Sequence, residues 1–341
     1  MILSGFWARR HLRFGPSELQ QGEVIMIKLG IISAATYGAT YRGEDVPRTP
    51  GSFHGTAFST TYNGFDAVKA KQWSWTFASG EKRIEGAKIV KVWDPHKEWA
   101  ERLAETCYID EVCETPEECA DGVDGVIIVD DGSGRQSDYA EYPLRKGVPT
   151  FCDKPLAMTA RRAKEIAELV RKTGTPFMSS SSLRFVPDII SLKNEIHNLG
   201  DVSLATAICG NELVYYGIHA LSMYYGVFGG GAISCLNVGK PGRNIVRVRF
   251  EDGRDLVLMV AEAEYMQAGY QINVYGTKGW QSLTPNLADL YYYLLERFMD
   301  MMKTGKETVP VEEEAEVIAV LEAGKRSILE SREVTLAEVL K

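Results

Sequence analysis

The segment VPTFCDKPLA, residues 148–157, decides how the chain folds. It begins as an apolar run with the length of a buried strand, which ends on two adjacent charges, Asp153 and Lys154, followed by Pro155. A turn that only crosses solvent would use Gly, Asn or Ser. Charged side chains at the carboxyl end of a buried strand are typical of the ligand site of an open α/β sheet. The segment therefore predicts a parallel sheet with a binding site at its carboxyl edge.

Strand-like and helix-like patterns alternate around this segment. The apolar, strand-like runs are residues 27–33, 87–94, 123–131 and 175–181. Helical patterns occupy residues 97–107 and 137–147, and a third helix follows with Ala163, Ile166, Ala167 and Val170 on one face. This alternation predicts an α/β fold, a doubly wound Rossmann sheet with right-handed crossovers.

The pattern changes after about residue 180. Strands separated by turns follow an amphipathic helix, and the step Glu251-Asp252-Gly253-Arg254 is a strong hairpin signal. Two helices end the chain. We therefore expect a nucleotide-binding domain over residues 27–180 and an α+β domain with a mostly antiparallel sheet over residues 181–341.

Residues 1–26 are expected to form an extension without structure of its own. Residues 1–25 lack the apolar core and cleavage site of a secretory signal. Codons for Gly22-Glu23-Val24 can resemble a bacterial ribosome-binding site ahead of Met26, so we expect translation to begin there. A genuine N-terminal arm is the alternative.

Composition restricts the class of protein. The 341 residues carry a net charge of -8, which argues against nucleic acid as a partner. No apolar run approaches the roughly 20 residues that a membrane helix needs. The six cysteines form no Cys-x-x-Cys pair and the five histidines are scattered. These features favour reduced thiols in a cytoplasmic protein and no metal site.

The loop after the first strand departs from the usual dinucleotide-binding fingerprint. Only Gly30 and Gly38 fall near the Gly-x-Gly-x-x-Gly frame. Small side chains still permit close approach of a pyrophosphate to the backbone at Ser33, Ala34, Ala35 and Thr36. The helix N-terminus that would hold phosphate is expected at Ser52 or His54, displaced by an insertion over residues 39–90.

Asp94 ends the second strand, where a carboxylate can bind the adenosine ribose and repel a 2′-phosphate. We therefore expect NAD as the cofactor, with NADP left open because Lys91, Lys97 and Arg102 lie close in sequence. A plain strand-ending turn at Asp94 is the alternative. Asp130 and Asp131, at the end of the third strand, and Asp153 are further candidates for cofactor contacts.

Four patterns in order resemble one enzyme family. They are CDKPLA at 152–157, SSLRFVP at 181–187, LKNEIHNLGDV at 192–202 and the C-terminal segment 294–336. The chain resembles the glucose–fructose oxidoreductase / inositol dehydrogenase (Gfo/Idh/MocA) family over residues 28–336. The resemblance implies a Rossmann domain, an α+β domain and reversible hydride transfer between NAD(P) and a hydroxyl of a sugar, cyclitol or glycoside.

The resemblance also implies site residues. The family's catalytic lysine falls on Lys154 and its histidine on His219. Tyr215 stands where the family has the Asp of Asp-x-x-x-His, and it is a further catalytic and substrate-binding candidate. Gln136 stands where the family has a histidine. Gln136 and Arg184 are expected to bind substrate together with Tyr215 and His219.

The residues leave alternatives open. Lys154 could have a structural role, paired to Asp153, and His219 could be a core histidine. The departures at the glycine loop, Tyr215 and Gln136 keep a non-catalytic or regulatory nucleotide-binding protein as the second hypothesis. Lys154 and His219 favour an NAD(P)-dependent oxidoreductase, which we expect to be a homodimer or homotetramer.

Overall fold

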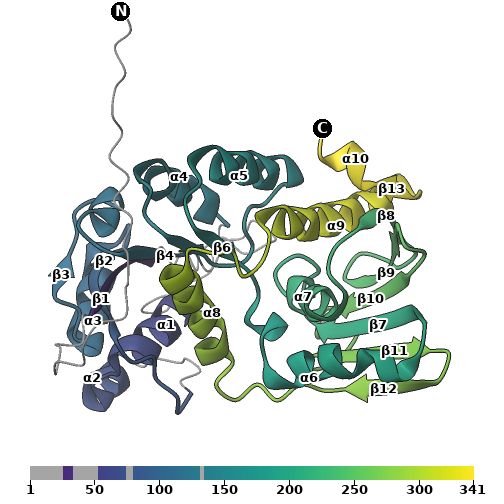
Figure 1. The fold of residues 1–341 in the computed structure, drawn as a ribbon, viewed down its shortest axis with the longest axis horizontal. Coiled ribbons are helices and arrows are strands. Elements are labelled where there is room, and N and C mark those ends of the chain that lie inside the picture. The colour runs from purple at the N-terminus through teal and green to yellow at the C-terminus, as the bar shows by residue number, and fades with distance from the viewer. Residues whose placement is uncertain (1–25, 34–52, 74–79, 131–133) are drawn as a thin grey trace, which may run out of the picture.

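A computed structural model of the chain describes residues 26–33, 53–73, 80–130 and 134–341 (Figure 1). Statements below apply to these residues. The predicted extension before Met26 lies outside them, as do Ala34, Ala35, Thr36 and Asp131.

Six parallel strands form the first sheet, in the order β3-β2-β1-β4-β5-β6. The strands are β1 (Ile27–Ser33), β2 (Ala87–Trp93), β3 (Glu111–Val112), β4 (Gly125–Val129), β5 (Thr150–Cys152) and β6 (Phe177–Ser179). The residues of β4 and β5 are fully buried, as expected for apolar strands covered on both faces. The strand order reverses between β1 and β4, which is where such sheets bind dinucleotides.

The helices of this part are α1 (Phe53–Asn63), α2 (Ala67–Gln72), α3 (Lys97–Cys107), α4 (Gln136–Lys146) and α5 (Ala160–Thr173). Helix α1 starts within the interval expected from Ser52 to His54. Local signals set the bounds of α5, since Thr159 accepts the N–H of Arg162 and Gly174 ends the helix with a left-handed conformation. The structure thus confirms the Rossmann arrangement of alternating strands and helices that the sequence predicted.

Seven strands form the second sheet, in the order β12-β11-β7-β10-β9-β8-β13. They are β7 (Val202–Gly210), β8 (Ala232–Asn237), β9 (Arg243–Phe250), β10 (Asp255–Ala261), β11 (Gln271–Gly276), β12 (Gly279–Leu283) and β13 (Val334–Thr335). Only β7 and β10 pair in parallel, so the expected mostly antiparallel sheet is confirmed. Strands β9 and β10 form the hairpin predicted at residues 251–254.

The helices of the second half are α6 (Pro187–Glu195), α7 (Gly217–Phe228), α8 (Leu290–Thr304), α9 (Val311–Glu330) and α10 (Leu336–Val339). Helices α7, α9 and α10 contact strands of the second sheet, and α8 contacts β6 of the first. Leu294 and Phe298 of α8 share a core with Leu29 and Ile89 of the first sheet. Helix α9 packs between α5 and β8 (Figure 1). The C-terminal segment therefore ties the two sheets together, and the expected boundary at residue 180 remains a prediction.

The described residues contain no helix long and apolar enough to cross a membrane. The six cysteines are buried and form no disulfide, in agreement with the expectation of reduced thiols. No group of three His, Cys, Asp or Glu side chains within the described ranges is placed to hold a metal ion.

Candidate active site

The end of β5 carries Asp153 and Lys154 to the carboxyl edge of the first sheet. The N–H of Asp153 donates to Ile128 O at 2.8 Å, which extends the pairing with β4 by one residue. The next peptide bond, Lys154–Pro155, is cis. In the described part of the chain no carboxylate pairs with the Lys154 ammonium. The end of the strand thus carries a half-buried ammonium that has no carboxylate partner among the described residues.

The Asp153 carboxylate is paired with His54 of α1. The distance between Asp153 Oδ2 and His54 Nδ1 is 2.6 Å, and the two side chains are 2% and 12% exposed. The His54 ring also packs against Phe58 and Tyr291, with centroid distances of 5.6 and 5.2 Å. His54 lies in the first turn of α1, where we expected the helix start that would bind phosphate, and its side chain contacts Asp153, the residue next to Lys154.

His219 lies in the first turn of α7. Its Nδ1 is 2.7 Å from Ser181 Oγ, and its ring meets Tyr270 edge-on at 5.5 Å. Burial, followed by the positive charges of Lys154 and His54, holds the pKa of His219 far below its usual range. The imidazole is therefore neutral at neutral pH, and the three basic side chains lie close enough to repel one another.

Tyr215 precedes α7 and is held from its backbone. The N–H groups of Val214 and Tyr215 both donate to Glu212 Oε2 at 2.7 Å. The Tyr215 hydroxyl contacts Met158 Sδ at 3.5 Å. Burial, with smaller effects of the Asp130 and Glu212 charges, raises the pKa of Tyr215 to about 12. The phenol stays protonated, so it can donate a hydrogen bond but cannot serve as a base near neutral pH.

Gln136 joins the ends of two neighbouring strands. Its Nε2 donates to Asp130 O at 3.0 Å and to Lys154 O at 3.2 Å. The side chain is fully buried, and its Oε1 has no hydrogen-bond partner in the described structure. The amide nitrogen, expected at the substrate, therefore positions the backbone of Lys154.

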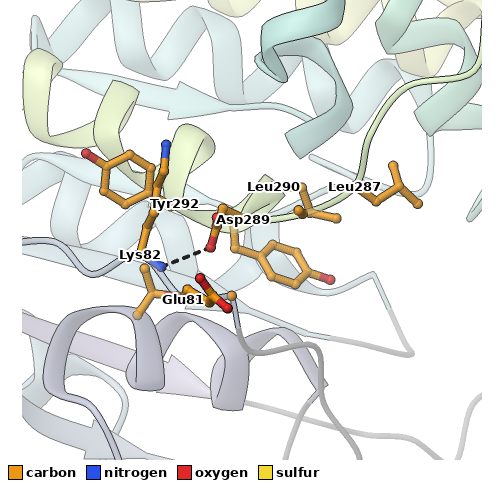
Figure 2. A pocket seen from close by; sticks show the side chains of 10 residues that line it. Glu81, Lys82, Leu287, Asp289, Leu290 and Tyr292 are labelled. Carbon is orange, nitrogen blue, oxygen red and sulfur yellow. Dashed lines mark hydrogen bonds between the residues drawn. The ribbon is translucent and has the colours of Figure 1, made fainter.

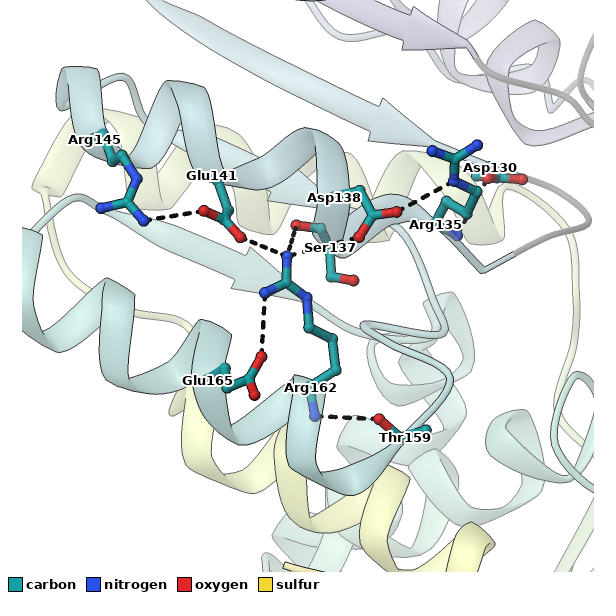
Figure 3. Close-up of polar contacts among 9 residues, drawn as sticks. All are labelled: Asp130, Arg135, Ser137, Asp138, Glu141, Arg145, Thr159, Arg162 and Glu165. Atoms are coloured by element: carbon teal, nitrogen blue, oxygen red, sulfur yellow. Dashed lines mark hydrogen bonds and ion pairs between the residues drawn. The ribbon is translucent and has the colours of Figure 1, made fainter.

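Ion pairs between α4 and α5 fix the start of α4, where Gln136 lies (Figure 3). Arg162 of α5 donates to Ser137 O at 3.2 Å and to Glu141 Oε1 at 2.7 Å. The N–H of Arg135 donates to Asp130 Oδ2 at 3.2 Å, so the buried Asp130 carboxylate is held at the same place. The loop between β4 and α4 is thus anchored on its C-terminal side.

Arg184 follows β6 and is almost fully buried. Its guanidinium forms ion pairs with Glu313 and with Glu314 of α9, the latter at 3.6 Å. Burial raises the pKa of Glu314 to about 7, and the nearby Arg184 opposes that shift. The structure therefore gives Arg184 partners in α9, where sequence reasoning expected a substrate contact.

Asp94 lies at the end of β2 and is 5% exposed. Its Oδ1 accepts the N–H of His96 at 2.7 Å, which turns the chain into α3. The three nearby cations are engaged elsewhere: Lys91 pairs with Glu111, Lys97 with Glu114 and Arg102 with Glu98. None of these pairs directs a positive charge to Asp94. A positive charge beside Asp94 would have favoured NADP.

Of the other residues expected to contact the cofactor, the structure describes only some. Ser33 is the last residue of β1 and is buried, at the point where the strand order reverses. Ala34, Ala35, Thr36 and Asp131 lie outside the described residues, so their expected cofactor contacts stay predictions.

A pocket of about 380 Å³ has a lining that includes Lys82, Asp289 and Tyr292 (Figure 2). It lies between the end of α1, residues 80–82 and the start of α8, and Tyr291 is part of its wall. The N–H of Lys82 donates to Asp289 Oδ1 at 2.9 Å, and the Lys82 ammonium donates to the Tyr293 hydroxyl at 2.9 Å. Because Tyr291 also packs on His54, the pocket adjoins the residues around Lys154.

Known proteins resemble both the sequence and the fold. Residues 65–181 match the family model described as "Oxidoreductase family, NAD-binding Rossmann fold" (GFO_IDH_MocA). A scyllo-inositol 2-dehydrogenase (NAD(+)) of Bacillus subtilis is 33% identical over 115 residues. That match covers 33% of this chain and 33% of the enzyme, so it spans about a third of the length of the curated relative.

Solved structures share the fold across almost the whole chain. The scyllo-inositol dehydrogenase of Lactobacillus casei, with bound NAD(H) and scyllo-inositol, superposes with a TM-score of 0.70 at 14% identity. It covers 92% of this chain and 99% of that structure. A myo-inositol dehydrogenase of Corynebacterium glutamicum gives a TM-score of 0.67 at 17% identity, with 91% and 99% covered. The family match over residues 65–181 and the sheet order agree in placing an NAD-binding Rossmann fold of the Gfo/Idh/MocA oxidoreductase type in this part of the chain.

Proposed function

We propose that the protein is an NAD-dependent oxidoreductase that transfers hydride between the nicotinamide and a hydroxyl of a cyclitol, sugar or glycoside. The observation that carries the proposal is that Lys154, which has no carboxylate partner among the described residues, lies near the neutral imidazole of His219 at the carboxyl edge of the sheet. The family match over residues 65–181 and the similarity of about a third of the chain to inositol dehydrogenases support it.

The residues at the sheet edge fit NAD. A buried carboxylate, Asp94, lies at the end of β2, and the order of strands reverses between β1 and β4. Asp94 would bind the adenosine ribose, the backbone after Ser33 the pyrophosphate, and the region of Asp130 and Lys154 the nicotinamide half. Bound NAD would supply the hydride acceptor for an alcohol, and NADH the donor for a ketone.

His219 acts as the base, and Lys154 stabilises the charge on the reacting oxygen. An alcohol that loses hydride must also lose its hydroxyl proton, so a base and a positive charge are needed at the same oxygen. His219 is neutral at neutral pH and can accept that proton. The Lys154 ammonium stabilises the negative charge that develops on the oxygen. The Tyr215 hydroxyl, protonated up to a pKa of about 12, is a hydrogen-bond donor to the substrate.

Gln136 and Asp153 keep this arrangement in place. Gln136 holds the carbonyl of Lys154, and Asp153 holds His54 beside it. The Asp153 carboxylate also offsets positive charge in a region that contains three basic side chains. Neither residue needs to touch the substrate for this role.

Self-association and a cytoplasmic location are part of the proposal. Leu204, Tyr275 and Trp280 are directly opposed on neighbouring strands of the second sheet, and all three are exposed. A row of exposed apolar side chains on a sheet face favours contact with a second copy of the chain. We therefore propose that homodimers or homotetramers form through this exposed apolar face. The buried free thiols are consistent with a reducing compartment such as the cytoplasm.

The test has two stages. Titration of the protein with NADH, followed by nicotinamide fluorescence, measures cofactor binding, and NADPH is the matched comparison. A panel of cyclitols and sugars is then assayed with NAD at 340 nm. NADH binding without turnover of any member would favour the second hypothesis, a regulatory nucleotide-binding protein, which Tyr215 in place of the family Asp first suggested.

A further inference from the structure

We propose that Ser181 is the positioning residue of His219, which holds the ring through Nδ1 and leaves Nε2 as the nitrogen that exchanges a proton with substrate. This inference rests on the proposed function and names a residue that sequence patterns did not single out. Ser181 follows β6, one strand away from Lys154, and its side chain is fully buried. The contact between Ser181 Oγ and His219 Nδ1, at 2.7 Å, joins the end of the first sheet to α7.

The hydrogen-bond capacity of the hydroxyl is compatible with a hydrogen on Nδ1 of His219. A serine oxygen has two acceptor lone pairs. The N–H of Leu183 donates to one of them at 3.2 Å, because Ser181 caps the short 3-10 helix Ser182–Arg184. In the proposed tautomer His219 Nδ1–H donates to the other. In this tautomer Nε2 keeps its lone pair, which is the condition for a base.

The same contact serves both protonation states of the ring. A protonated imidazole carries hydrogens on both nitrogens, so Nδ1–H continues to donate to Ser181 Oγ after Nε2 has taken the substrate proton. The opposite tautomer, with the hydroxyl donating to Nδ1, would lose this bond on protonation. Ser181 therefore permits proton transfer without rotation of the ring.

A neutral partner also sets how basic the ring is. Imidazoles in hydrolytic triads are oriented by a carboxylate, which stabilises the imidazolium. Here the partner is a hydroxyl, and the hydroxyl of Tyr215, at the family's Asp position, contacts Met158. The other titratable groups around His219 are Lys154, His54, Tyr216 and Tyr270. None of these carries negative charge near neutral pH, so the ring gains no anionic support from them.

Substitution separates the positioning role from a general effect on folding. Ser181→Ala should lower kcat by about 10–100-fold, the usual scale for an orienting partner, with little change in the Kd of NADH. Ser181→Thr keeps the hydroxyl and should restore most of the activity. Ser222→Ala is the matched control, since Ser222 is a fully buried serine of α7 whose hydroxyl has no partner in the described structure. It should leave kcat unchanged.

The charge of the partner gives a second readout. Ser181→Asp places a carboxylate against Nδ1 and should raise the pKa of His219 by roughly 1–3 units. The acidic limb of the kcat/KM profile should move up by the same amount. An unchanged limb in an active, folded Ser181→Asp variant would contradict the contact.

The tautomer is read directly by ¹⁵N NMR of the histidine rings, with His219 assigned by its loss in His219→Gln. We expect neutral His219 to carry its hydrogen on Nδ1. A hydrogen on Nε2, or full kcat in Ser181→Ala, would overturn the proposal. Because the NMR measurement needs no turnover, it tests Ser181 even if the substrate panel fails and the proposed function falls.

Discussion

The carboxyl end of β2 differs from the ends of β5 and β6 in how charged side chains are arranged. At the end of β2, Lys91, Lys97 and Arg102 are each paired with a glutamate, and the carboxylate of Asp94 is buried and accepts the N–H of His96. At the ends of β5 and β6, Lys154 has no carboxylate partner among the described residues, and His219 is neutral. Under the proposed function, Asp94 at the first end binds a neutral ribose, and Lys154 at the second stabilises charge that forms during the reaction.

This difference has an energetic basis. Exposed ion pairs contribute little to stability, so the pairs of Lys91, Lys97 and Arg102 add little to the stability of the fold. Burial, together with the charges of Lys154 and His54, lowers the pKa of His219, so its imidazole is neutral. Ionisable groups whose pKa is shifted from its ordinary value are typical of catalytic sites. The predictions below test each end in turn.

The largest effect is expected at His219. His219→Gln removes the base while keeping a polar side chain of similar length, so kcat should fall by about 10²–10⁴-fold. The Kd of NADH should change little, because we propose that His219 contacts the substrate and not the cofactor. Steady-state kinetics on an identified substrate, with a fluorescence titration of the cofactor, measure both. A variant with wild-type kcat would mean that His219 is a core histidine.

Lys154→Ala should lower kcat by about 10²–10³-fold, the scale for the loss of one preorganised electrostatic donor. It should also raise the pKa of His219, because the Lys154 charge is one of the causes that depress it. The acidic limb of the residual activity should therefore move to higher pH. Lys154→Arg is the matched control that keeps the charge. An acidic limb at the same pH in Lys154→Ala and the wild type would show that the two side chains do not interact.

At the other end, Asp94→Ala should weaken NAD binding by roughly tenfold or more, the scale for hydrogen bonds to a charged group. NADP binding should weaken less, so the preference for NAD should narrow. Paired titrations with NADH and NADPH give the ratio. Lys97→Ala, which removes one of the engaged cations, is the control and should leave the ratio unchanged. Tighter binding of NADPH by the wild type would show that the assignment of Asp94 is wrong.

The smallest effect concerns stability at Glu314. Its carboxyl has an ordinary pKa of 4.5 that burial raises to about 7 in the folded protein. The folded state therefore binds the proton more tightly, and stability falls as pH rises from about 4.5 to about 7. Glu314→Gln should reduce the loss of unfolding free energy between pH 5 and pH 8 by about 1–3 kcal/mol. Urea denaturation at the two pH values measures it, with the exposed Glu168→Gln as control. An identical loss in both variants would contradict the role of burial.

The sequence predicted the parts of the fold that local patterns encode. The apolar run of β1, the hairpin of β9 and β10 and the helix α5 follow from residues within a few positions of one another. The packing of α8 on the first sheet was not predicted, because its apolar face fits any buried surface. Periodicity specifies that a face is buried and does not specify its partner.

The candidate site was predicted where a motif marks it and missed where a contact is long-range. Lys154 and His219 stand in recognisable patterns, and the structure brings them close together. The contact of His54 with Asp153 joins residues 99 positions apart, and that of Ser181 with His219 joins residues 38 positions apart. Gln136 and Arg184 were assigned by analogy with family positions, and their side chains are engaged with backbone carbonyls and with α9 glutamates.

The rate of NADH formation from a cyclitol or sugar, compared between the wild type and Lys154→Ala at equal cofactor saturation, tests the central claim most directly. The account predicts that the wild type reduces NAD at 340 nm with at least one member of the panel. It also predicts that Lys154→Ala binds NAD normally and reduces it at least about 100-fold more slowly. Equal rates for the two proteins, or a wild type that binds NAD and oxidises no member of the panel, would contradict it.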